Sequence, residues 1–485
     1  MYVLTKYGDE LALVFSPDET VRLGDTLVID DIVAQVIDIQ FADLPGVLEH
    51  ILRKSLIAES ETEEHVQPEL QSVVDSLTDQ KLARAKIRGH LEQEKTNKGA
   101  KRTFKTGLSE FNISRAKAAV QILPQDALFD SLDLAFSPSC DLGVTLSSDR
   151  TSFDILIDRL GINLITGMKG SGKSYLAKRL LLKLIDSKVL TVVFDLNAEY
   201  LNLRNADELT PSKYADQMIT FTPYLEQESD YERVLMIPVN EITYDDFAAF
   251  VNVPRESAMY LYLIQFWRQT RDTAFTLDDL ERFVRSIDNE FARAGLLVRV
   301  EVARSSGLFG PNSVTGFIRA MQKEGGAIIF NLSEMSHWER KIAVEFVLRR
   351  LVRLGQAHEF EAVSLFLEEA QLYVEEQNMI DIVTRMRHSG IFPTFITNTP
   401  RTLPDDVFTL LDNLVAFSFR NEDELRQLAR SGLIDQKSIN ALQHLEKQQC
   451  IAVGKITSQY PLFVEIQPQT GVLMGGETRK LLPTG

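Results

Sequence analysis

At 485 residues the chain is long enough for about two to four domains, and its 44% hydrophobic and 25% charged residues are typical of a soluble globular protein. A net charge of −17 argues against a protein whose whole surface coats nucleic acid. Cys140 and Cys450 lie far apart without metal-ligand spacing, so we expect no disulfide framework and a reducing, cytoplasmic compartment. No signal-peptide pattern and no bilayer-length apolar run occurs, so we expect no membrane association.

The first 150 residues are predicted to form a small β-barrel or sandwich with a helical insertion. Apolar and polar positions alternate over the first 40 residues, with turns at Gly8-Asp9 and Gly24-Asp25. Helical spacing and a Glu-rich stretch replace this alternation at about 44–81, where we predict an acidic helical insertion. Strand-like sequence resumes at 85–91, and a further strand is predicted near 108–113.

Charge is distributed unevenly over this region. Residues 1–80 hold 4 Lys/Arg and 17 Asp/Glu, whereas residues 81–105 hold 9 Lys/Arg and 2 Asp/Glu. The second group includes a basic strip in a predicted turn, which consists of Lys95, Lys98, Lys101, Arg102 and Lys105. The strip is compatible with contacts to nucleic-acid phosphates, with a protein-docking face and with a solvated loop.

From residue 151 to 468 the pattern changes to alternating strands and helices. Apolar strands are predicted at 190–194, 327–332, 363–367, 394–397, 413–417 and 449–453. This alternation is typical of a parallel sheet covered by helices, an α/β domain. A helical subdomain is predicted at about 205–325, and residues 469–485 form a C-terminal tail.

Residues 167–174 read Gly-Met-Lys-Gly-Ser-Gly-Lys-Ser, a complete G-x-x-x-x-G-K-[ST] phosphate-binding loop between an apolar strand and a helical pattern. Its backbone N–H groups and the following helix N-terminus would surround the phosphates of ATP. Lys173 would contact the phosphates, and the Ser174 hydroxyl would ligate Mg²⁺. The predicted nucleotide-binding residues here are Gly167, Gly170, Ser171, Gly172, Lys173, Ser174 and Tyr175. The structural alternative is an ordinary Gly-rich turn.

The apolar run at 363–367 ends in Glu368 and Glu369, the form expected of a Walker B strand. Glu368 would hold the Mg²⁺ shell, and Glu369 would orient and polarise the attacking water. A pair of solvated glutamates at a strand end is the structural alternative.

Other strand ends supply further candidates. Asp195 and Glu199 follow the strand at 190–194, where ligands meet a parallel sheet. Asn398 ends another strand and is a candidate sensor of the γ-phosphate or the water. Arg387, together with Arg385, is a candidate arginine finger toward a neighbouring subunit. Ordinary turns and a solvated helix end are the alternatives.

These motifs together resemble the HerA family of hexameric DNA translocases, in the HerA–FtsK group. The first strands look like the HerA-associated barrel, and the phosphate loop matches the family's. The segment ending in Tyr200 is similar to the family's Asp-Pro-His-Gly-Glu-Tyr, and the segment ending in Gln371 is similar to its Asp-Glu-Ala-His. The segment ending in Pro400 is similar to its Ser/Thr-Gln-Arg-Pro. Glu368 replaces Asp, Gln371 replaces His and Asn398 replaces Gln. Arg387 falls on the family's Gly-Arg-Lys segment, which favours it over Arg385 as the finger.

The resemblance implies a RecA-like ATPase core in a homo-hexameric ring, with ATP sites between subunits and duplex DNA in the channel. It also implies a partner on the N-terminal barrel face, a nuclease or another effector such as a NAD-consuming enzyme, in DNA end processing or antiphage defence. The tail would reach a neighbouring subunit. The alternative function is an ATP-dependent scaffold that holds an effector enzyme with little motor activity. The sequence leaves open whether six or seven subunits close the ring.

Overall fold

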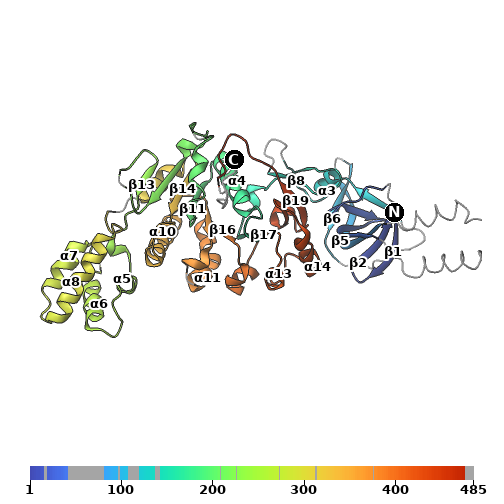
Figure 1. The fold of residues 1–485 in the computed structure, drawn as a ribbon. Coiled ribbons are helices and arrows are strands. Elements are labelled where there is room, and N and C mark those ends of the chain that lie inside the picture. Colours follow the sequence, from blue (N-terminus) through green and yellow to red (C-terminus); the bar gives the residue numbers. More distant parts are fainter. Residues whose placement is uncertain are drawn as a thin grey trace, which may run out of the picture. The chain divides into compact units, whose positions relative to one another are not determined.

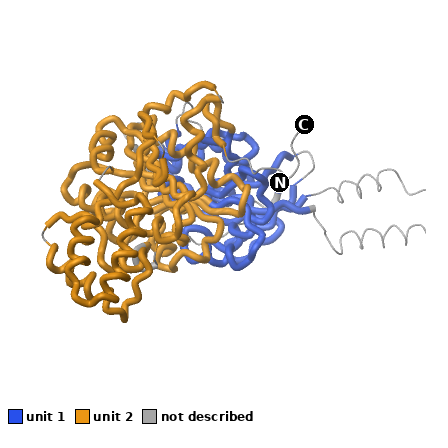
Figure 2. The backbone as a smooth tube through the Cα atoms, turned by 60° about the vertical axis from the view of Figure 1, so that its left-hand side comes forward, with its two compact units in different colours: residues 1–156, 416–467 blue, residues 157–415, 468–485 orange. Residues whose placement is uncertain are grey.

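The structure, a computed structural model, describes residues 1–15, 19–41, 81–96, 99–107, 119–136, 142–207, 209–225, 227–271, 273–311, 314–374 and 376–475. The predicted acidic insertion, apart from Lys81, lies outside these residues, as do the strand predicted near 108–113 and the tail after residue 475. The chain forms two compact units, residues 1–156 with 416–467 and residues 157–415 with 468–485 (Figure 2). The first unit therefore includes residues 416–467, which the sequence analysis assigned to the ATPase domain.

The first unit contains a seven-stranded antiparallel sheet in the order β1-β2-β5-β4-β3-β7, with β6 paired to β5 (Figure 1). The strands are β1 (Tyr2–Tyr7), β2 (Glu10–Phe15), β3 (Thr26–Ile29), β4 (Ile32–Phe41), β5 (Lys81–Thr96), β6 (Gly99–Lys105) and β7 (Val120–Leu123). Alternate residues such as Leu11, Leu13 and Phe15 enter one buried core, as the period-2 pattern predicts. The sheet is open rather than closed, because β1 and β7 stand at the two ends of its order.

The basic strip predicted in a turn lies instead on a β-hairpin. Lys101, Arg102 and Lys105 belong to β6, which pairs with β5 from Gly99 to Lys105. Lys101 is ion-paired with Asp133 at 3.4 Å. Lys98 lies outside the described residues.

The rest of the first unit contains α3 (Gln125–Ser131), β8 (Gly143–Thr145), β9 (Ser152–Phe153), α13 (Glu422–Ala429), α14 (Gln436–Asn440), β18 (Gln449–Gly454) and β19 (Leu462–Ile466). β19 pairs antiparallel with both β18 and β8, which explains why residues 416–467 cluster with the N-terminal region. Arg88 of β5 donates to Asp435 at 2.7 Å and to Ser438 at 2.7 Å, and so joins the antiparallel sheet to α14.

The second unit contains a parallel sheet in the order β13-β12-β14-β11-β15-β16-β10. Its strands are β10 (Asn163–Thr166), β11 (Leu190–Asp195), β12 (Met218–Thr222), β13 (Glu232–Val234), β14 (Gly326–Asn331), β15 (Val363–Glu368) and β16 (Ile391–Thr397). β17 (Asn413–Phe417) follows β10 in the order, and the division between the units falls within it. The central strands β11 and β15 are buried throughout, as expected of a parallel sheet covered on both faces.

Helices cover this sheet on two faces (Figure 1). α4 (Lys173–Asp186) connects β10 to β11, whereas α10 (His337–Gln356) and α11 (Glu376–Arg385) make connections that run the opposite way across the sheet order. Right-handed crossovers in opposite directions place their helices on opposite faces. α12 (Asp405–Thr409) precedes β17. The predicted α/β class is confirmed.

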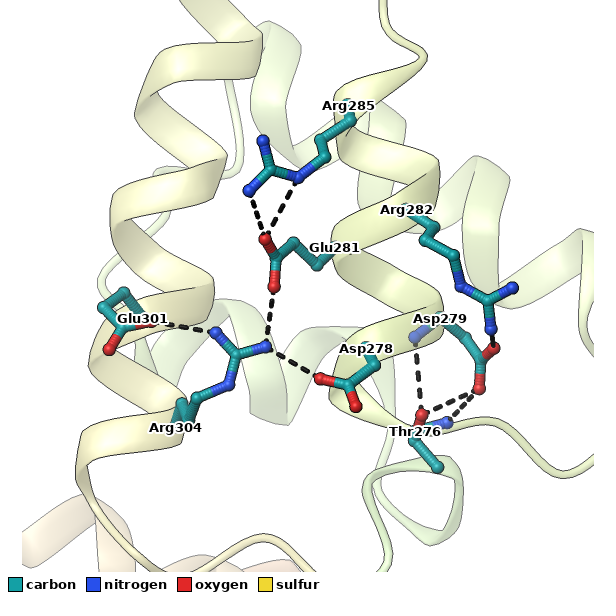
Figure 3. A network of polar contacts seen from close by, with 8 residues as sticks. All are labelled: Thr276, Asp278, Asp279, Glu281, Arg282, Arg285, Glu301 and Arg304. Carbon is teal, nitrogen blue, oxygen red and sulfur yellow. Dashed lines mark hydrogen bonds and ion pairs between the residues drawn. The ribbon is translucent and has the colours of Figure 1, made fainter.

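The segment predicted as helical at 205–325 is helical only in part. It first contributes β12 and β13, whose short strands extend one edge of the sheet. The helices are α5 (Tyr244–Phe250), α6 (Ala258–Gln269), α7 (Leu277–Arg285), α8 (Glu290–Ser305) and α9 (Val314–Met321). Arg304 of α8 donates to Glu301 of the same helix and to Asp278 and Glu281 of α7, fixing the α7–α8 pair (Figure 3). Among the described residues, no helix is both long and apolar enough to cross a membrane.

Candidate active site

The candidate residues gather at the carboxyl edge of four adjacent strands, β11, β15, β16 and β10. β10 leads into the phosphate loop, β15 into Glu368 and Glu369, and β16 into Asn398. Because these strands are parallel, their carboxyl ends meet at one edge of the sheet. Residues separated by more than 200 positions in the sequence thus come together.

The phosphate loop has the backbone that its glycines predict. Gly170 has φ of 80° and Gly172 has φ of 124°, conformations that residues with a side chain rarely adopt. Gly172 precedes the first residue of α4, so the loop ends at a helix N-terminus, where free N–H groups favour an anion. Ser174 is half-buried in the first turn of α4, and Ser171 is buried with no hydrogen-bond partner for its hydroxyl among the described residues.

Lys173 is buried, and its ammonium group donates to the side-chain oxygen of Asn398. A longer contact of 3.4 Å joins the same nitrogen to the Met168 carbonyl. Burial lowers the pKa of Lys173, while the negative charges of Glu369, Glu199 and Glu368 oppose that shift. Lys173 therefore lies among acidic side chains, and its ammonium group is directed toward the end of β16.

Glu369 is held by three hydrogen-bond donors. Its Oε2 accepts from the Thr397 hydroxyl at 2.8 Å and from Gln371 Nε2 at 2.7 Å, and its Oε1 accepts from the Asn398 backbone N–H at 3.0 Å. Its backbone adopts a left-handed conformation with φ of 46°, which is uncommon outside glycine. Three donors on a carboxylate that can accept about four leave one acceptor site, on Oε1.

Glu368 lies at the end of β15 in a contrasting environment. It is 3% exposed, and neither carboxylate oxygen has a hydrogen-bond partner among the described residues. Burial raises its pKa well above the ordinary value, and the charges of Asp195 and Glu199 add to that rise. The nearby Tyr200 hydroxyl lowers the pKa of Glu368 in part, but within the described residues this hydroxyl also has no hydrogen-bond partner. Two buried carboxylate oxygens without protein donors in the described part of the chain fit the role of a cation ligand.

Asp195 and Glu199 have partners within the protein. Asp195 is fully buried, and its carboxylate accepts from the backbone N–H groups of Asn197, Glu199 and Tyr200 at 2.9–3.2 Å. Burial raises the pKa of Asp195, whereas these hydrogen bonds lower it. Glu199 is ion-paired at 3.3 Å with Lys178, which is 2% exposed. Asp195 thus shapes the turn after β11, and Glu199 neutralises a buried lysine of α4.

Tyr175 and Lys178, both on α4, hold the segment after residue 467. The Tyr175 hydroxyl accepts from the Gln469 backbone N–H at 2.6 Å, and Lys178 donates to the Met474 carbonyl at 2.8 Å. The first part of the predicted C-terminal tail therefore lies along the helix that follows the phosphate loop of its own chain.

Arg387 is not brought to the phosphate loop by any contact that the structure contains. It lies in the 3₁₀ turn η6 (Met386–Ser389), is 45% exposed and pairs with Asp412 at 3.3 Å. Arg385 is 79% exposed and pairs with Asp381 of its own helix. The exposed position of Arg387 suits a residue that acts on another molecule.

Sequence reasoning missed Thr397 and Lys178 as parts of the site. Thr397 immediately precedes the candidate sensor at the end of β16, so its position was itself a signal. Lys178 interrupts the buried residues of α4 such as Leu176 and Leu180, and a lysine on an apolar helix face requires a partner. The described residues contain no group of three or more His, Cys, Asp or Glu side chains arranged to hold a metal by themselves.

A strand, a glycine-rich loop with a buried lysine, a helix, and an adjacent strand that ends in two glutamates define a P-loop nucleotide-hydrolysing domain. Residues 146–351 match the family model described as "Helicase HerA, central domain", so this part of the chain is a HerA-type P-loop ATPase domain. The match confirms the resemblance seen in the sequence. It covers the phosphate loop, Asp195 and Glu199 but ends before β15.

Several solved structures are similar to the chain at low identity. VirB4 of Thermoanaerobacter pseudethanolicus is 14% identical, with a TM-score of 0.48 over 69% of this chain and 98% of that one. The bacterial conjugative coupling protein TrwB is 15% identical, with a TM-score of 0.43 over 71% and 93%. The genome packaging NTPase B204 of Sulfolobus turreted icosahedral virus 2 is 12% identical, with a TM-score of 0.34 over 64% and 100%. No curated protein matches the sequence.

Proposed function

We propose that this ATPase assembles as a homo-hexameric ring and couples ATP hydrolysis to movement along duplex DNA, together with a nuclease or another effector protein. One observation carries the hydrolytic part of the proposal. Glu369 is oriented by Thr397, Gln371 and Asn398, and Asn398 in turn accepts from Lys173. The hydrolytic acid and the phosphate-binding lysine are thus joined through one sensor residue.

The phosphate loop would bind ATP through its backbone N–H groups, with Lys173 leaving Asn398 to contact the phosphates. When Lys173 moves away, the Asn398 side-chain oxygen is free to accept from the water, and its side-chain N–H could donate to the γ-phosphate. Asn398 would therefore report whether the phosphate site is filled. Glu199 supports α4, the helix after this loop, through Lys178, and Asp195 fixes the turn that carries Glu199, whereas Tyr175 of α4 holds the segment at Gln469.

Ser174 and Glu368 are the residues that would hold Mg²⁺. The fit is supported by the orphaned oxygens of Glu368, which are buried at the end of β15. A hydroxyl and a carboxylate are oxygen ligands of the kind that Mg²⁺ prefers, alongside substrate phosphates. When bound, the ion would neutralise charge on the phosphate oxygens. The Glu side chain has one carbon more than the family's Asp and reaches further from the strand.

Glu369 would position and polarise the attacking water. Three of its acceptor sites are filled by protein donors, so the remaining site on Oε1 fixes where a water hydrogen can bind. A carboxylate held from three directions does not need to reorganise when the water is bound. This arrangement supports turnover rather than nucleotide storage.

Arg387 would act on the ATP of a neighbouring subunit. The guanidinium is half-exposed and has a carboxylate partner, Asp412, from which it could be withdrawn. Asp412 is 10% exposed and also accepts from the Ile162 backbone N–H at 2.9 Å, so its carboxylate keeps a hydrogen bond when Arg387 turns to a γ-phosphate. A finger in trans requires a ring, which is consistent with the hexamer.

The DNA and the effector are the parts of the proposal that rest on the family. The basic residues of β6 are candidate phosphate contacts, and the strongly acidic first 80 residues suit docking of a protein partner. The same acidic region favours the alternative function, a ring that binds ATP mainly to hold an effector enzyme. Stimulation of hydrolysis by duplex DNA distinguishes the motor from the scaffold.

Glu369→Gln tests the site itself. The amide cannot accept the water's proton, so we expect nucleotide binding within twofold of the wild type and turnover reduced by at least about 100-fold. Binding is measured by titration with a fluorescent ATP analogue, and turnover by phosphate release. Retained turnover would remove Glu369 from the role of catalytic base.

A further inference from the structure

A cavity of about 420 Å³ lies between α10 and α11 in the second unit, on the helix-covered side of β15 and β16. Its apolar wall consists of Val344, Leu348, Val352, Ile382 and Met386. The α10 residues among these are spaced four apart, so they form one face of that helix. A volume in this range is that of small-molecule sites, which are mostly apolar with a few polar groups.

Three guanidinium groups border this cavity. Arg349 is paired with Glu345 at 2.8 Å and with Asp246 at 3.2 Å, and Arg385 is paired with Asp381 at 3.4 Å. Arg353 is 64% exposed, and its contact with the Glu241 carboxylate is long, at 3.9 Å. Glu241 is also held by Arg350, so it keeps an ion-pair partner if Arg353 turns away. Arg353 is therefore the guanidinium at the rim that an anion can engage without leaving a carboxylate unpaired.

Tyr373 connects the cavity to the hydrolytic acids. It lines the cavity, is 3% exposed, and its hydroxyl has no hydrogen-bond partner among the described residues. Its ring packs edge-on against Phe194 of β11 at 6.2 Å. Burial raises the pKa of Tyr373 well above its ordinary value, and the charges of Glu368, Glu369 and Asp195 raise it further. The backbone N–H of Tyr373 also donates to the carbonyl of Ala370, the residue after Glu369, at 3.1 Å, so the same residue lines the cavity and is joined to the segment of the Walker acids.

The cavity also borders the segment that carries the candidate finger. Met386 and Ser389, the first and last residues of η6, both line it, and Arg387 lies between them. A molecule in the cavity would contact α10, α11 and η6 at once, and would change the packing of Tyr373.

We propose that this cavity is an effector site for an amphipathic organic anion. The apolar body of the ligand would contact Leu348, Ile382 and Met386, and its carboxylate or sulfonate would bind the Arg353 guanidinium. Because Tyr373 lines the cavity and is bonded through its backbone to Ala370, next to Glu369, occupancy of the cavity and of the nucleotide site are coupled. The coupling rests on the proposed ATP site, whereas ligand binding itself does not.

Anilinonaphthalene sulfonate, an amphipathic anion that fluoresces in apolar sites, is the probe, titrated into the full chain. We expect saturable binding, weakened at least fivefold by Arg353→Glu, which inverts the anion contact at an exposed position. Val352→Trp, which fills the cavity from a half-buried position, should weaken binding as much. Since the two changes act by charge and by volume, failure of one variant to fold leaves the other as a test.

Two controls separate this site from other surfaces. Arg282→Glu inverts an exposed arginine that, like Arg385, pairs with a carboxylate of its own helix. Val302→Asp removes an exposed apolar residue of α8, which is the kind of surface that a competing, non-specific dye site would use. Both should bind the probe as the wild type does. Equal binding by all four variants would overturn the proposal.

The coupling is measured by binding alone. Coupling free energies are reciprocal, so a non-hydrolysable ATP analogue should change the probe affinity at least twofold in the wild type. Tyr373→Ala should abolish this change while probe binding persists. An affinity that is indifferent to the analogue, in protein that binds the analogue, would overturn the coupling. Neither binding measurement requires ATP hydrolysis or ring assembly. The effector site can therefore be refuted or supported independently of the proposed motor function.

Discussion

Thr397→Val is the sharpest test of how Glu369 is positioned. Thr397 is 1% exposed, and its hydroxyl donates to Glu369 Oε2 at 2.8 Å and accepts from the Thr399 N–H at 3.1 Å. Valine has nearly the same shape, so the change removes the hydroxyl without leaving a cavity. A hydrogen bond to a charged group contributes about 1.5–3 kcal/mol. Gln371 and the Asn398 N–H still hold the carboxylate, so we expect the lower end, about 1.5 kcal/mol.

That energy corresponds to roughly a tenfold fall in kcat. The assay is the initial rate of phosphate release against MgATP concentration, which separates kcat from KM. Because Thr397 touches no part of the phosphate loop through its hydroxyl, KM should stay within about twofold. Thr397→Ser keeps the hydroxyl and should recover most of the rate. A valine variant as fast as the wild type, or a serine variant as slow as valine, would refute the reasoning.

Three further predictions concern charge. Glu199→Gln leaves the buried Lys178 without its carboxylate partner, and it should lower the free energy of unfolding of the second unit by on the order of 2 kcal/mol in urea denaturation. The double variant with Lys178→Met has no unpaired buried charge and should recover stability. A double variant as unstable as Glu199→Gln would contradict this explanation. Burial opposes ionisation of Asp435, but Arg88 and Ser438 hold its pKa well below the ordinary 3.8, so its stabilising contribution is full above the ordinary pKa and is lost only as the pH falls through the lowered pKa. Asp435→Asn should therefore destabilise the protein at pH 7, and by progressively less as the pH is lowered below about 4; a loss that is the same at every pH would contradict the ion pair. Arg387→Ala should reduce the rate of ATP hydrolysis at least about tenfold while the mass of the particle in solution is unchanged. Mixed rings of Arg387→Ala and Glu369→Gln subunits should recover some activity, because some interfaces then combine an intact Arg387 with an intact Glu369. Mixed rings without activity would weaken a simple model in which Arg387 acts on the neighbouring subunit, although a ring whose subunits act in concert would give the same result.

The sequence predicted the second unit's strands closely because parallel, doubly covered strands are continuous apolar runs. The strands predicted at 190–194 and 363–367 correspond to β11 and β15 within one residue at each end. The same rule failed for β12 and β13, which are short, lie at the sheet edge and are embedded among helices. The grouping of residues 416–467 with the N-terminal region depends on the pairing of β19 with β8. Pairing over more than 300 residues leaves no local signal.

The site was predictable in its parts but not in its connections. Sequence motifs locate both Lys173 and Glu369. Lys173 belongs to the phosphate loop that follows β10, and Glu369 directly follows the apolar strand β15. That Asn398 links them depends on the neighbouring positions of β10, β16 and β15 in the sheet. Asp195 was predicted to border the nucleotide, and the structure gives its carboxylate three backbone partners in its own turn. Whether it also contacts ATP stays a prediction.

The most direct test of the account is ATP hydrolysis by the purified full chain with and without duplex DNA, on a sample whose solution mass is measured in parallel. We predict a particle of about six subunits whose turnover rises with DNA of any sequence, and whose stimulation falls as salt is added. A monomer that hydrolyses ATP at the same rate with and without DNA would contradict both the ring and the motor.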